Sequence, residues 1–368
     1  MRPIVVLVAT LALACGRKAA PPGAPPPTPV AVTTPAAPAA CLRDVGQVQP
    51  ARGAPAEPLR PTHTFSIVAR DPATGDLGVA VQSHWFAVGA GVTWAASGVG
   101  AIATQSFAEP AYGRKGLERM RAGASAPDAL AALLAEDPKR DVRQVAFVDA
   151  TGKVSAHTGA ANIPFAGDRQ GDGYSVQANL MANDKVVPAM ATAYETTRGD
   201  LATRMLAALV AAQDAGGDVR GCQSAAMLIV KGAASAEPSH DTVVDLRVDD
   251  SADPLAELAR LLALQRVYDH MNAGDLAVEQ GDVAGARDHY GAAAAAAPGL
   301  AEVRYWQAVG LATAGDVDGA LPIFKQVFAE DNRWVEVTRR IQPAVVPATP
   351  AGTALIERIL TVAPAPAP

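Results

Sequence analysis

Hydroxyl, amide and imidazole side chains gather at the ends of three β-rich runs in the first third of this 368-residue chain. The set consists of Thr64, Ser66, Gln82, Ser83, His84, Thr104 and Gln105. A hydroxyl acts as a nucleophile when a nearby base accepts its proton, and amide groups can donate hydrogen bonds to an oxyanion. An imidazole can carry a proton near neutral pH. These side-chain types can support hydrolytic chemistry if the three runs bring them together.

The three runs are predicted β-strands. Thr64–Arg70 and Leu77–Ser83 are β-rich and alternate, and the residues Pro72–Asp76 between them favour a turn. This pattern predicts a hairpin. A third run, Gly98–Thr104, is short, apolar and β-branched, which indicates a buried strand.

The elements that follow alternate between helices and strands. Helical spacing is found over 112–122, 126–136, 186–195 and 201–215, and Ser125 is a plausible N-cap. Further strands are expected over 142–149, 154–157, 176–179, 223–230 and 243–248. This order suits two layers of sheet with helices outside them.

Several spaced segments resemble one known family. Thr64–Asp71, Gly78–Ser83, Gly98–Ala101 and Ala103–Ser106 resemble the DUF1028 family, and so do residues 156–159, 176–179, 221–226 and 245–250. The likeness covers residues 63 to 262. The resemblance implies an α+β fold, a four-layer αββα sandwich of the N-terminal nucleophile (Ntn) hydrolase type. It leaves the substrate open.

The resemblance makes Thr64 the candidate nucleophile. An Ntn enzyme uses a hydroxyl or thiol on the first residue of a strand, with that residue's own α-amine as the base. Thr64 would offer both after removal of the preceding residues, because an α-amine has a pKa near 8 and is partly neutral at pH 7. Thr62 and Ser66 are rivals, although Ser66 is internal to the strand and Thr62 lies outside the matched segments.

Other positions depart from the proteasome-like pattern. Gln82 stands where those subunits carry an acidic residue, and His84 stands where they carry arginine. The chain also has no lysine between Lys18 and Lys115. These departures argue against ordinary proteasome-like peptidase activity. The oxyanion donors would then be backbone amides or the side-chain amides of Gln82, Gln105 or Asn179.

Two histidines follow strand residues. His84 and His157 either face a shared cleft or are structural groups held by hydrogen bonds. The amide of Asn179 likewise serves either an oxyanion or a hydrogen bond at the edge of the core. No metal site and no cofactor are expected, since the chain has no CxxC, no glycine-rich phosphate loop and no Gly-x-Ser-x-Gly motif.

The N-terminal part is predicted to be an export and anchoring segment. Residues 1–14 are typical of a signal peptide, and Leu11–Gly16 is similar to a bacterial lipobox that would lipidate Cys15. The alternative is plain secretion. Residues 15–62 are rich in Pro and Ala, which predicts a disordered tether. We therefore expect a cell-envelope lipoprotein that contacts the membrane only through its lipid.

Two further cysteines remain. Because an exported compartment permits disulfides, we hypothesise a bond between Cys41 and Cys222 that ties the tether to the domain. The alternative is two free thiols. Cys222 is not a credible nucleophile, because no histidine is close to it in sequence.

The C-terminal part is predicted to be helical. The predicted domains are 63–252 for the Ntn-like domain, 253–342 for the helical domain and 343–368 for a mostly disordered Ala/Pro-rich tail. Order at Leu355–Leu360 is the alternative for that part of the tail. Gly281, Asp282, Ala286, Tyr290 and Ala293 are echoed 34 residues later by Gly315, Asp316, Ala320, Phe324 and Val327. This offset resembles tetratricopeptide (TPR) repeats, with helices at 254–270 and 333–341 as caps. An Ala-rich helical hairpin is the alternative.

Two functions are compatible with these features. A formal net charge of −6 gives no support to nucleic-acid binding. The first function is an envelope-anchored Ntn-type amidohydrolase that acts on a small amide or peptide through Thr64. The second is a non-catalytic Ntn-fold binding module whose TPR-like repeats recruit a protein partner.

Overall fold

The computed structural model describes residue 62, residues 64–342 and residues 344–365. The predicted signal peptide, the lipidation site Cys15 and the disulfide partner Cys41 lie outside these residues. So does all of the predicted tether except Thr62.

A six-stranded antiparallel sheet contains the predicted first hairpin. The strand β1 (Thr64–Arg70) pairs with β2 (Leu77–Ser83) on one side and with β8 (Tyr174–Ala178) on the other. The sheet is completed by β9 (Ser224–Val230), β10 (Thr242–Val248) and β7 (Gly167–Gly171), in the order β10-β9-β2-β1-β8-β7. The chain therefore places β1 in the middle of this sheet.

A second antiparallel sheet has four strands. Its order is β3-β4-β5-β6, formed by β3 (Thr93–Ala96), β4 (Gly100–Ser106), β5 (Arg143–Asp149) and β6 (Val154–Thr158). The short helix α1 (Gly89–Val92) leads into β3. The sequence did not predict β3, α1 or β7.

The two sheets pack face to face through an apolar core. Val68 and Val79 of the first sheet share a buried cluster with Ala101 and Val148 of the second. This burial is favourable because it removes apolar surface from water on both sheets. Side chains alternate along a strand, so every second residue of β1, β2, β4 and β5 faces this inter-sheet layer.

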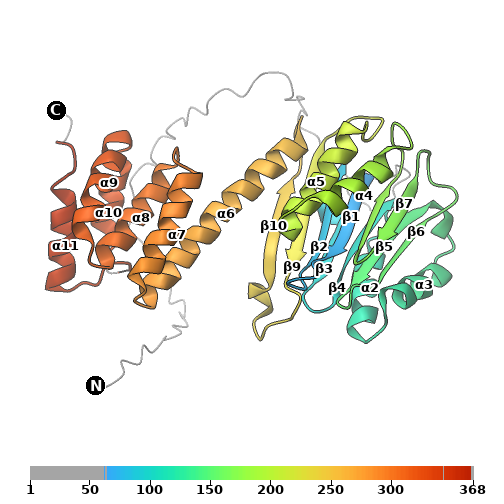
Figure 1. Cartoon of the computed structure of the whole chain (residues 1–368), viewed down its shortest axis with the longest axis horizontal. Helices are drawn as coiled ribbons and strands as arrows, with labels where there is room; N and C mark the ends of the chain where they lie inside the picture. The colour runs from blue at the N-terminus through green and yellow to red at the C-terminus, as the bar shows by residue number, and fades with distance from the viewer. Residues whose placement is uncertain (1–61, 63, 343, 366–368) are drawn as a thin grey trace, which may run out of the picture. The chain divides into compact units, whose positions relative to one another are not determined.

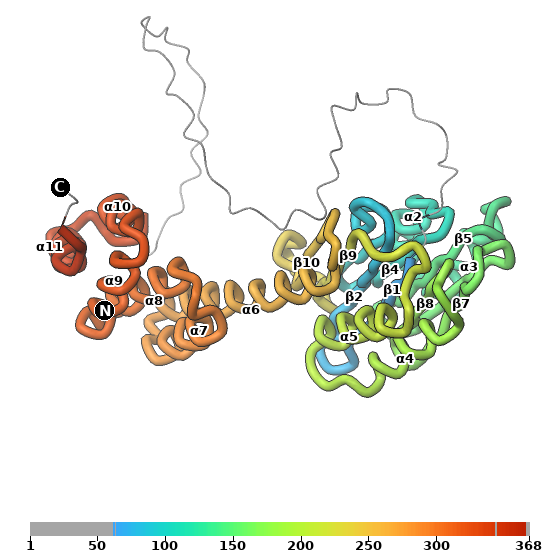
Figure 2. Tube along the Cα trace, turned by 90° about the horizontal axis from the view of Figure 1, so that it is seen from above, coloured from blue at the N-terminus to red at the C-terminus, as the bar shows by residue number. Residues whose placement is uncertain are grey.

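Helices cover the outer face of each sheet (Figures 1 and 2). The helices α2 (Ala111–Arg121) and α3 (Ala126–Glu136) pack on the four-stranded sheet, over Ile102 and Phe147. The helices α4 (Val186–Thr196) and α5 (Leu201–Asp214) pack on the six-stranded sheet, around Phe65. The expected mixed α+β fold with antiparallel sheets is confirmed.

The helix α6 (Pro254–Glu279) is longer than the predicted helix, which ended at His270. Its first half buries Leu255, Leu258 and Leu262 in the core shared with α4 and α5. Its second half buries Val267 in a separate cluster with residues of α7 and α8. The core of the first domain therefore continues beyond the predicted boundary at residue 252.

The helices α7 (Val283–Ala296) and α9 (Val317–Glu330) begin in the same way. Each follows a glycine with positive φ, Gly281 at 75° and Gly315 at 96°, which glycine adopts without steric cost. Asp282 and Asp316 then cap the two helices by accepting from the backbone N–H three residues later. The 34-residue offset of the sequence is thus an offset between equivalent helix starts.

Further helices follow these. They are α8 (Ala301–Thr313), α10 (Arg333–Arg340) and α11 (Pro350–Leu360). The helix α11 contains the segment Leu355–Leu360 that was excepted from the predicted disorder and begins five residues earlier, where Thr349 accepts a capping hydrogen bond from the Gly352 amide at 3.1 Å. Ile356 and Ile359 of this helix are buried in a cluster with residues of α8, α9 and α10. The apolar spacing of the segment outweighs its Ala/Pro-rich surroundings.

Candidate functional site

Thr64 opens β1 with its side chain between the two sheets. It lies directly opposite Ser83 in the β1–β2 register and has no exposed surface. The Thr64 hydroxyl lies 3.2 Å from Ser83 Oγ and donates to the carbonyl oxygen of Thr62 at 2.8 Å. The candidate nucleophile is therefore held by two defined oxygen atoms.

A buried network of amides and hydroxyls continues from Thr64 along the inter-sheet layer. Ser66 Oγ donates to Gln105 Oε1 at 2.6 Å and accepts from Gln177 Nε2 at 2.5 Å. Gln144 Oε1 accepts from Gln105 Nε2 at 2.7 Å and from Asn179 Nδ2 at 2.8 Å. All five side chains are fully buried. A satisfied buried network of this kind is rigid, because each group depends on its partners.

The network is bonded to the backbone of Thr64 itself. The Thr64 carbonyl oxygen accepts from the backbone N–H of Asn179 at 3.1 Å and from the side-chain Nε2 of Gln105 at 3.3 Å. The structure thus brings together Thr64, Ser83, Gln105 and Asn179 from four strand ends. Preorganised N–H donors beside a hydroxyl are what an acyl-transfer site needs.

Gln144 is a central member of this network that the sequence reasoning missed. It lies on β5, where it alternates with Ala146 and Val148 on the inter-sheet face. Its Nε2 donates to the Ala178 carbonyl at 2.9 Å and to Thr158 Oγ1 at 3.0 Å. The available signal was an amide at an inward position of a strand that is otherwise apolar on that face.

Gln82 does not join the site. It lies opposite Phe65 in the register, and Phe65 belongs to the core beneath α4 and α5. The Gln82 side chain therefore projects from the sheet face opposite to that of Thr64. It is fully buried there, and neither of its amide atoms has a hydrogen-bonding partner among the described residues. A role for Gln82 as an oxyanion donor to Thr64 is excluded by this geometry.

The two histidines do not share a cleft with Thr64. His157 lies opposite Val145, on the face of the four-stranded sheet that α2 and α3 cover, and its Nε2 is 2.8 Å from the Arg140 carbonyl oxygen. His84 is half-buried just beyond β2, and its buried Nδ1 has no hydrogen-bonding partner within the described part of the chain. The expectation of a common cleft is wrong, because His157 lies on an outer sheet face.

Ser106 is the last residue of β4 and lies next to Thr62. Its backbone forms an isolated antiparallel bridge with Thr62, in which Thr62 N donates to Ser106 O at 2.5 Å and Ser106 N donates to Thr62 O at 2.9 Å. The residue has a φ of 67°, and its buried hydroxyl has no hydrogen-bonding partner among the described residues. Thr62 is therefore held against the candidate nucleophile, whose hydroxyl donates to its carbonyl oxygen.

An ion pair fixes the backbone next to Ser106. Arg143 donates to the Phe107 carbonyl oxygen at 2.6 Å and to the Asp137 carboxylate at 2.9 Å. Burial alone would raise the pKa of Asp137, but hydrogen bonds from Arg143, the Lys139 amide and Tyr112 outweigh it and lower that pKa. The carboxylate is thus ionised at neutral pH and holds the guanidinium in place.

Cys222 is the cysteine that the described residues contain. Its thiol donates to the Ala252 carbonyl oxygen at 3.1 Å. Burial, together with the negative charge of Asp253, raises the pKa of this thiol. A raised pKa reduces the thiolate fraction, which agrees with Cys222 not being a nucleophile.

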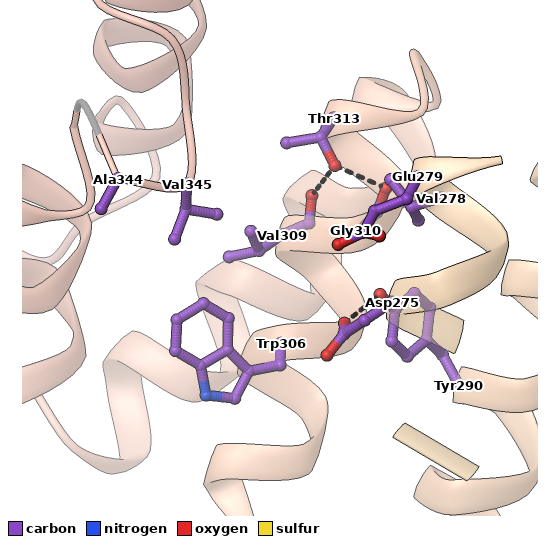
Figure 3. Close-up of a pocket in the computed structure, with 10 residues that line it drawn as sticks. All are labelled: Asp275, Val278, Glu279, Tyr290, Trp306, Val309, Gly310, Thr313, Ala344 and Val345. Carbon is purple, nitrogen blue, oxygen red and sulfur yellow. Dashed lines mark hydrogen bonds between the residues drawn. The ribbon is translucent and has the colours of Figure 1, made fainter. Parts of the chain in front are cut away.

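A cavity of about 360 Å³ lies in the helical region (Figure 3). Asp275 and Glu279 project from one side of α6, and Asp275 Oδ1 accepts a hydrogen bond of 2.6 Å from Tyr290. Trp306 and Val309 line the cavity from α8. No basic side chain is among the described residues that line it. The cavity therefore combines an aromatic, apolar wall with two carboxylates.

The described ranges contain neither a metal-ion cluster nor a membrane-spanning helix. Within them, no group of three or more His, Cys, Asp or Glu side chains is placed to hold a metal ion. No helix of the described residues has the length and apolar character needed to cross a bilayer.

Comparisons with known proteins point to one family. A family model described as "Family of unknown function (DUF1028)" matches residues 64–258, which is more than half of the chain. Among solved structures, the chain is similar to the crystal structure of a DUF1028 protein from Silicibacter pomeroyi. The sequence identity is 30%, the similarity covers 55% of this chain and 88% of that chain, and the TM-score is 0.49. No curated protein matches the chain.

Proposed function

The chain belongs to the DUF1028 family, whose function is unknown, and on that premise we propose that its first domain is an Ntn-type amidohydrolase with Thr64 as nucleophile. Two stacked antiparallel sheets with helices on both outer faces support a four-layer αββα sandwich of that class. The observation that carries the proposal is the position of Thr64. It starts a central strand, its buried hydroxyl contacts Ser83 Oγ between the sheets, and its backbone carbonyl oxygen accepts from the buried amide of Gln105.

The proposed reaction is hydrolysis of an amide through an ester on Thr64. Thr64 Oγ attacks the carbonyl carbon while its proton passes to the Thr64 α-amine. The C–N bond then breaks, and the leaving nitrogen takes that proton. Water next attacks the ester carbon, again giving its proton to the α-amine, and the acid is released as Thr64 Oγ recovers a proton. Ser83 Oγ, 3.2 Å away, orients the hydroxyl.

The amide network supplies the polarity that this reaction requires. Negative charge develops on the carbonyl oxygen in the transition state and is stabilised by fixed N–H donors. The side-chain amide of Gln105 donates to the Thr64 carbonyl oxygen, and the side-chain amide of Asn179 belongs to the same network through Gln144. Because the network is buried and rigid, its dipoles need little reorganisation during the reaction.

The reaction requires a free α-amine on Thr64. In the intact chain that nitrogen belongs to the peptide bond with residue 63, so the proposal includes cleavage between residues 63 and 64. The proposal also includes export and lipid anchoring at Cys15, which rest on the sequence of residues 1–16. The intact chain would be an inactive precursor.

Intact-mass and N-terminal analysis of protein from the envelope tests this proposal. We expect a chain that begins at Thr64 and gains one acyl group from a β-lactone, a reagent that acylates activated hydroxyls. Thr64→Ala should abolish the acylation. Thr242→Ala, at the exposed first residue of β10, is the matched control and should leave it unchanged. A single uncut chain that is never acylated would overturn the enzyme function.

A second function is supported by the cavity of Figure 3. We propose that the helical region is TPR-like and recruits a protein partner through a basic segment. Two carboxylates and the ring of Trp306 can both attract a cationic side chain. Asp275 and Glu279 have no ion-pair partner among the described residues, so they are available for such a ligand.

Calorimetric titration with a synthetic Lys- and Leu-rich peptide tests this second function. The double variant Asp275→Asn, Glu279→Gln should weaken binding at least tenfold, because it removes both charges. The control Glu357→Gln removes an exposed charge of α11 that does not line the cavity. Equal binding by all three proteins would overturn the basic-segment assignment. Thr64→Ala should have no effect here, which separates this function from the enzymatic one.

A further inference from the structure

The residue that covers Thr64 is bound like a residue of an extended peptide. Thr62 exchanges two backbone hydrogen bonds with Ser106, one through its N–H and one through its carbonyl oxygen. The same carbonyl oxygen also accepts from the Thr64 hydroxyl at 2.8 Å. A peptide carbonyl thus lies in contact with both the candidate nucleophile and a backbone N–H donor.

Ser106 has a conformation that needs an explanation. Its φ of 67° lies in the left-handed region, which residues other than glycine, asparagine and aspartate rarely adopt. Such strain persists where the surrounding structure imposes it, and it is concentrated at functional sites. Here the Arg143 guanidinium fixes the next carbonyl, that of Phe107, at 2.6 Å. The backbone groups of Ser106 are therefore held in position beside Thr64.

We propose that Ser106 is the substrate-binding residue of the Thr64 site and that the substrate is an extended peptide. The inference rests on the proposed function. A substrate residue takes the place of Thr62, its N–H donating to Ser106 O and its carbonyl oxygen accepting from Ser106 N. That carbonyl then lies within reach of Thr64 Oγ, and Ser106 N–H becomes a donor to its oxyanion.

Two consequences follow from this assignment. A compact small amide without a backbone N–H next to its carbonyl can make only half of the bridge, so peptides are the favoured class. Thr62 occupies the backbone groups of Ser106 that the substrate would use, so it blocks them until the chain is cut before Thr64 and Thr62 leaves.

The proposal is tested by the binding of a peptide that has the sequence of the residues before Thr64. The protein would be the full chain with a specific protease site placed before Thr64, cut so that every element from β1 to α11 is retained. The probe is a synthetic peptide of residues 55–63, and binding is measured by calorimetry. A second probe carries an N-methyl group on the Thr62 nitrogen, which removes the one N–H that donates to Ser106 O.

We expect one peptide to bind per chain, and N-methylation to weaken it at least tenfold. The Ser106 amide should exchange rapidly with solvent after the cut and become protected again when the unmodified peptide is added. Thr242→Ala changes the exposed first residue of β10, which is outside this site, so it should bind both peptides as the parent does. Circular dichroism checks that each protein is folded.

Three results would overturn the proposal. The first is that the unmodified peptide does not bind, and the second is that the N-methyl peptide binds equally well. The third is that the exchange rate of the Ser106 amide changes neither after the cut nor when the unmodified peptide is added. None of these measurements needs turnover. Acylation of Thr64 together with equal binding of both peptides would remove the Ser106 assignment and leave the amidohydrolase intact. Tighter binding of the unmodified peptide than of the N-methyl peptide, without acylation of Thr64, would remove the amidohydrolase function and leave the Ser106 assignment.

Discussion

Gln82 and Phe65 face each other across β1 and β2, and both project into the helix-covered face of the six-stranded sheet. The next pair in the same register, Thr64 and Ser83, projects into the inter-sheet layer. A shift of one residue along a strand therefore separates a candidate site residue from an apolar core. This alternation decides which polar residues of the hairpin can take part in chemistry.

Gln82→Met should stabilise the protein. The buried amide of Gln82 has no hydrogen-bonding partner among the described residues, and such a group costs about 1–3 kcal/mol. Methionine has a similar volume, so we expect the free energy of unfolding to rise by about 1–2 kcal/mol. Urea denaturation measures this change. Acylation of Thr64 should be unaffected.

Gln177→Met is the matched control for that substitution. Gln177 is equally buried, but it donates to Ser66 Oγ and accepts from Ser175 Oγ at 3.0 Å. Its loss leaves the buried Ser175 hydroxyl without this acceptor and removes one of the two hydrogen bonds of Ser66 Oγ, which still donates to Gln105. We therefore expect destabilisation of about 2–4 kcal/mol. A change of the same sign in both variants would contradict this account of the two glutamines.

Acid should weaken the start of α3 through Asp149. This carboxylate accepts from the amides of Ala126, Thr151 and Lys153 and from the Thr151 hydroxyl. Burial alone would raise its pKa, but these hydrogen bonds outweigh it and lower the pKa. A lowered pKa in the folded state stabilises the protein above the unfolded value of about 4, and the stabilisation is lost as pH falls through the folded value.

Asp149→Asn should therefore lower the free energy of unfolding most at neutral pH. We expect about 1–3 kcal/mol at pH 7, because the amide presents N–H groups to backbone N–H donors. The difference from the parent should shrink below pH 4. Asp172→Asn, at an exposed carboxylate between β7 and β8, should change little at either pH. A deficit for Asp149→Asn that is independent of pH would show that the charge of Asp149 is not the cause.

The hypothesised Cys41–Cys222 disulfide would keep the lipid anchor attached after cleavage before Thr64. Cys222 adjoins Gln223, whose amide donates to Ser83 O at 3.0 Å, so it lies near the strand end where Thr62 enters. We expect cut protein to run as two chains on a reducing gel and as one on a non-reducing gel. Cys222→Ser should give two chains on both gels. Free thiols on Cys41 and Cys222 in envelope protein would disprove the bond.

Truncation should separate the two halves of α6. A chain that ends after residue 272 retains Leu255, Leu258 and Leu262, and we expect it to be soluble and folded. A chain that ends after residue 252 lacks all three, and each buried leucine contributes about 2 kcal/mol. Thermal unfolding of the two proteins measures the difference. Precipitation of the longer chain would indicate that the later helices are part of its core.

The sequence predicted those elements whose pattern repeats strongly. The β1–β2 hairpin alternates clearly, and α3 has a capping serine and regular apolar spacing, so its bounds were found. The strand β7 has the sequence GDRQG and little burial, and β3 has four half-buried residues. Neither carries an alternation that distinguishes a strand from a loop, because neighbouring strands impose their conformation.

The candidate site was predictable in its residue types but not in its geometry. Thr64, Gln105 and Asn179 stand at strand ends, and the structure brings them together. Gln144 lies on β5, beside Gln105 in the four-stranded sheet, whereas Asn179 follows β8 of the six-stranded sheet. Only the stacking of the two sheets lets Gln144 bond to both. Sequence reasoning also could not reveal that Thr62 covers the site, since this depends on the end of β4 lying alongside it.

The helix α6 joins two cores without a break in its backbone. Its buried leucines in the first core end at Leu262, and its buried residues in the second core begin at Val267. Between them, Gln265 donates to the Val243 carbonyl oxygen at 2.6 Å, and Arg266 forms an ion pair with Asp200. If the later helices open, a helix–coil junction must form inside α6, because its first half stays buried. A single helix should then have two opening free energies, one for each core.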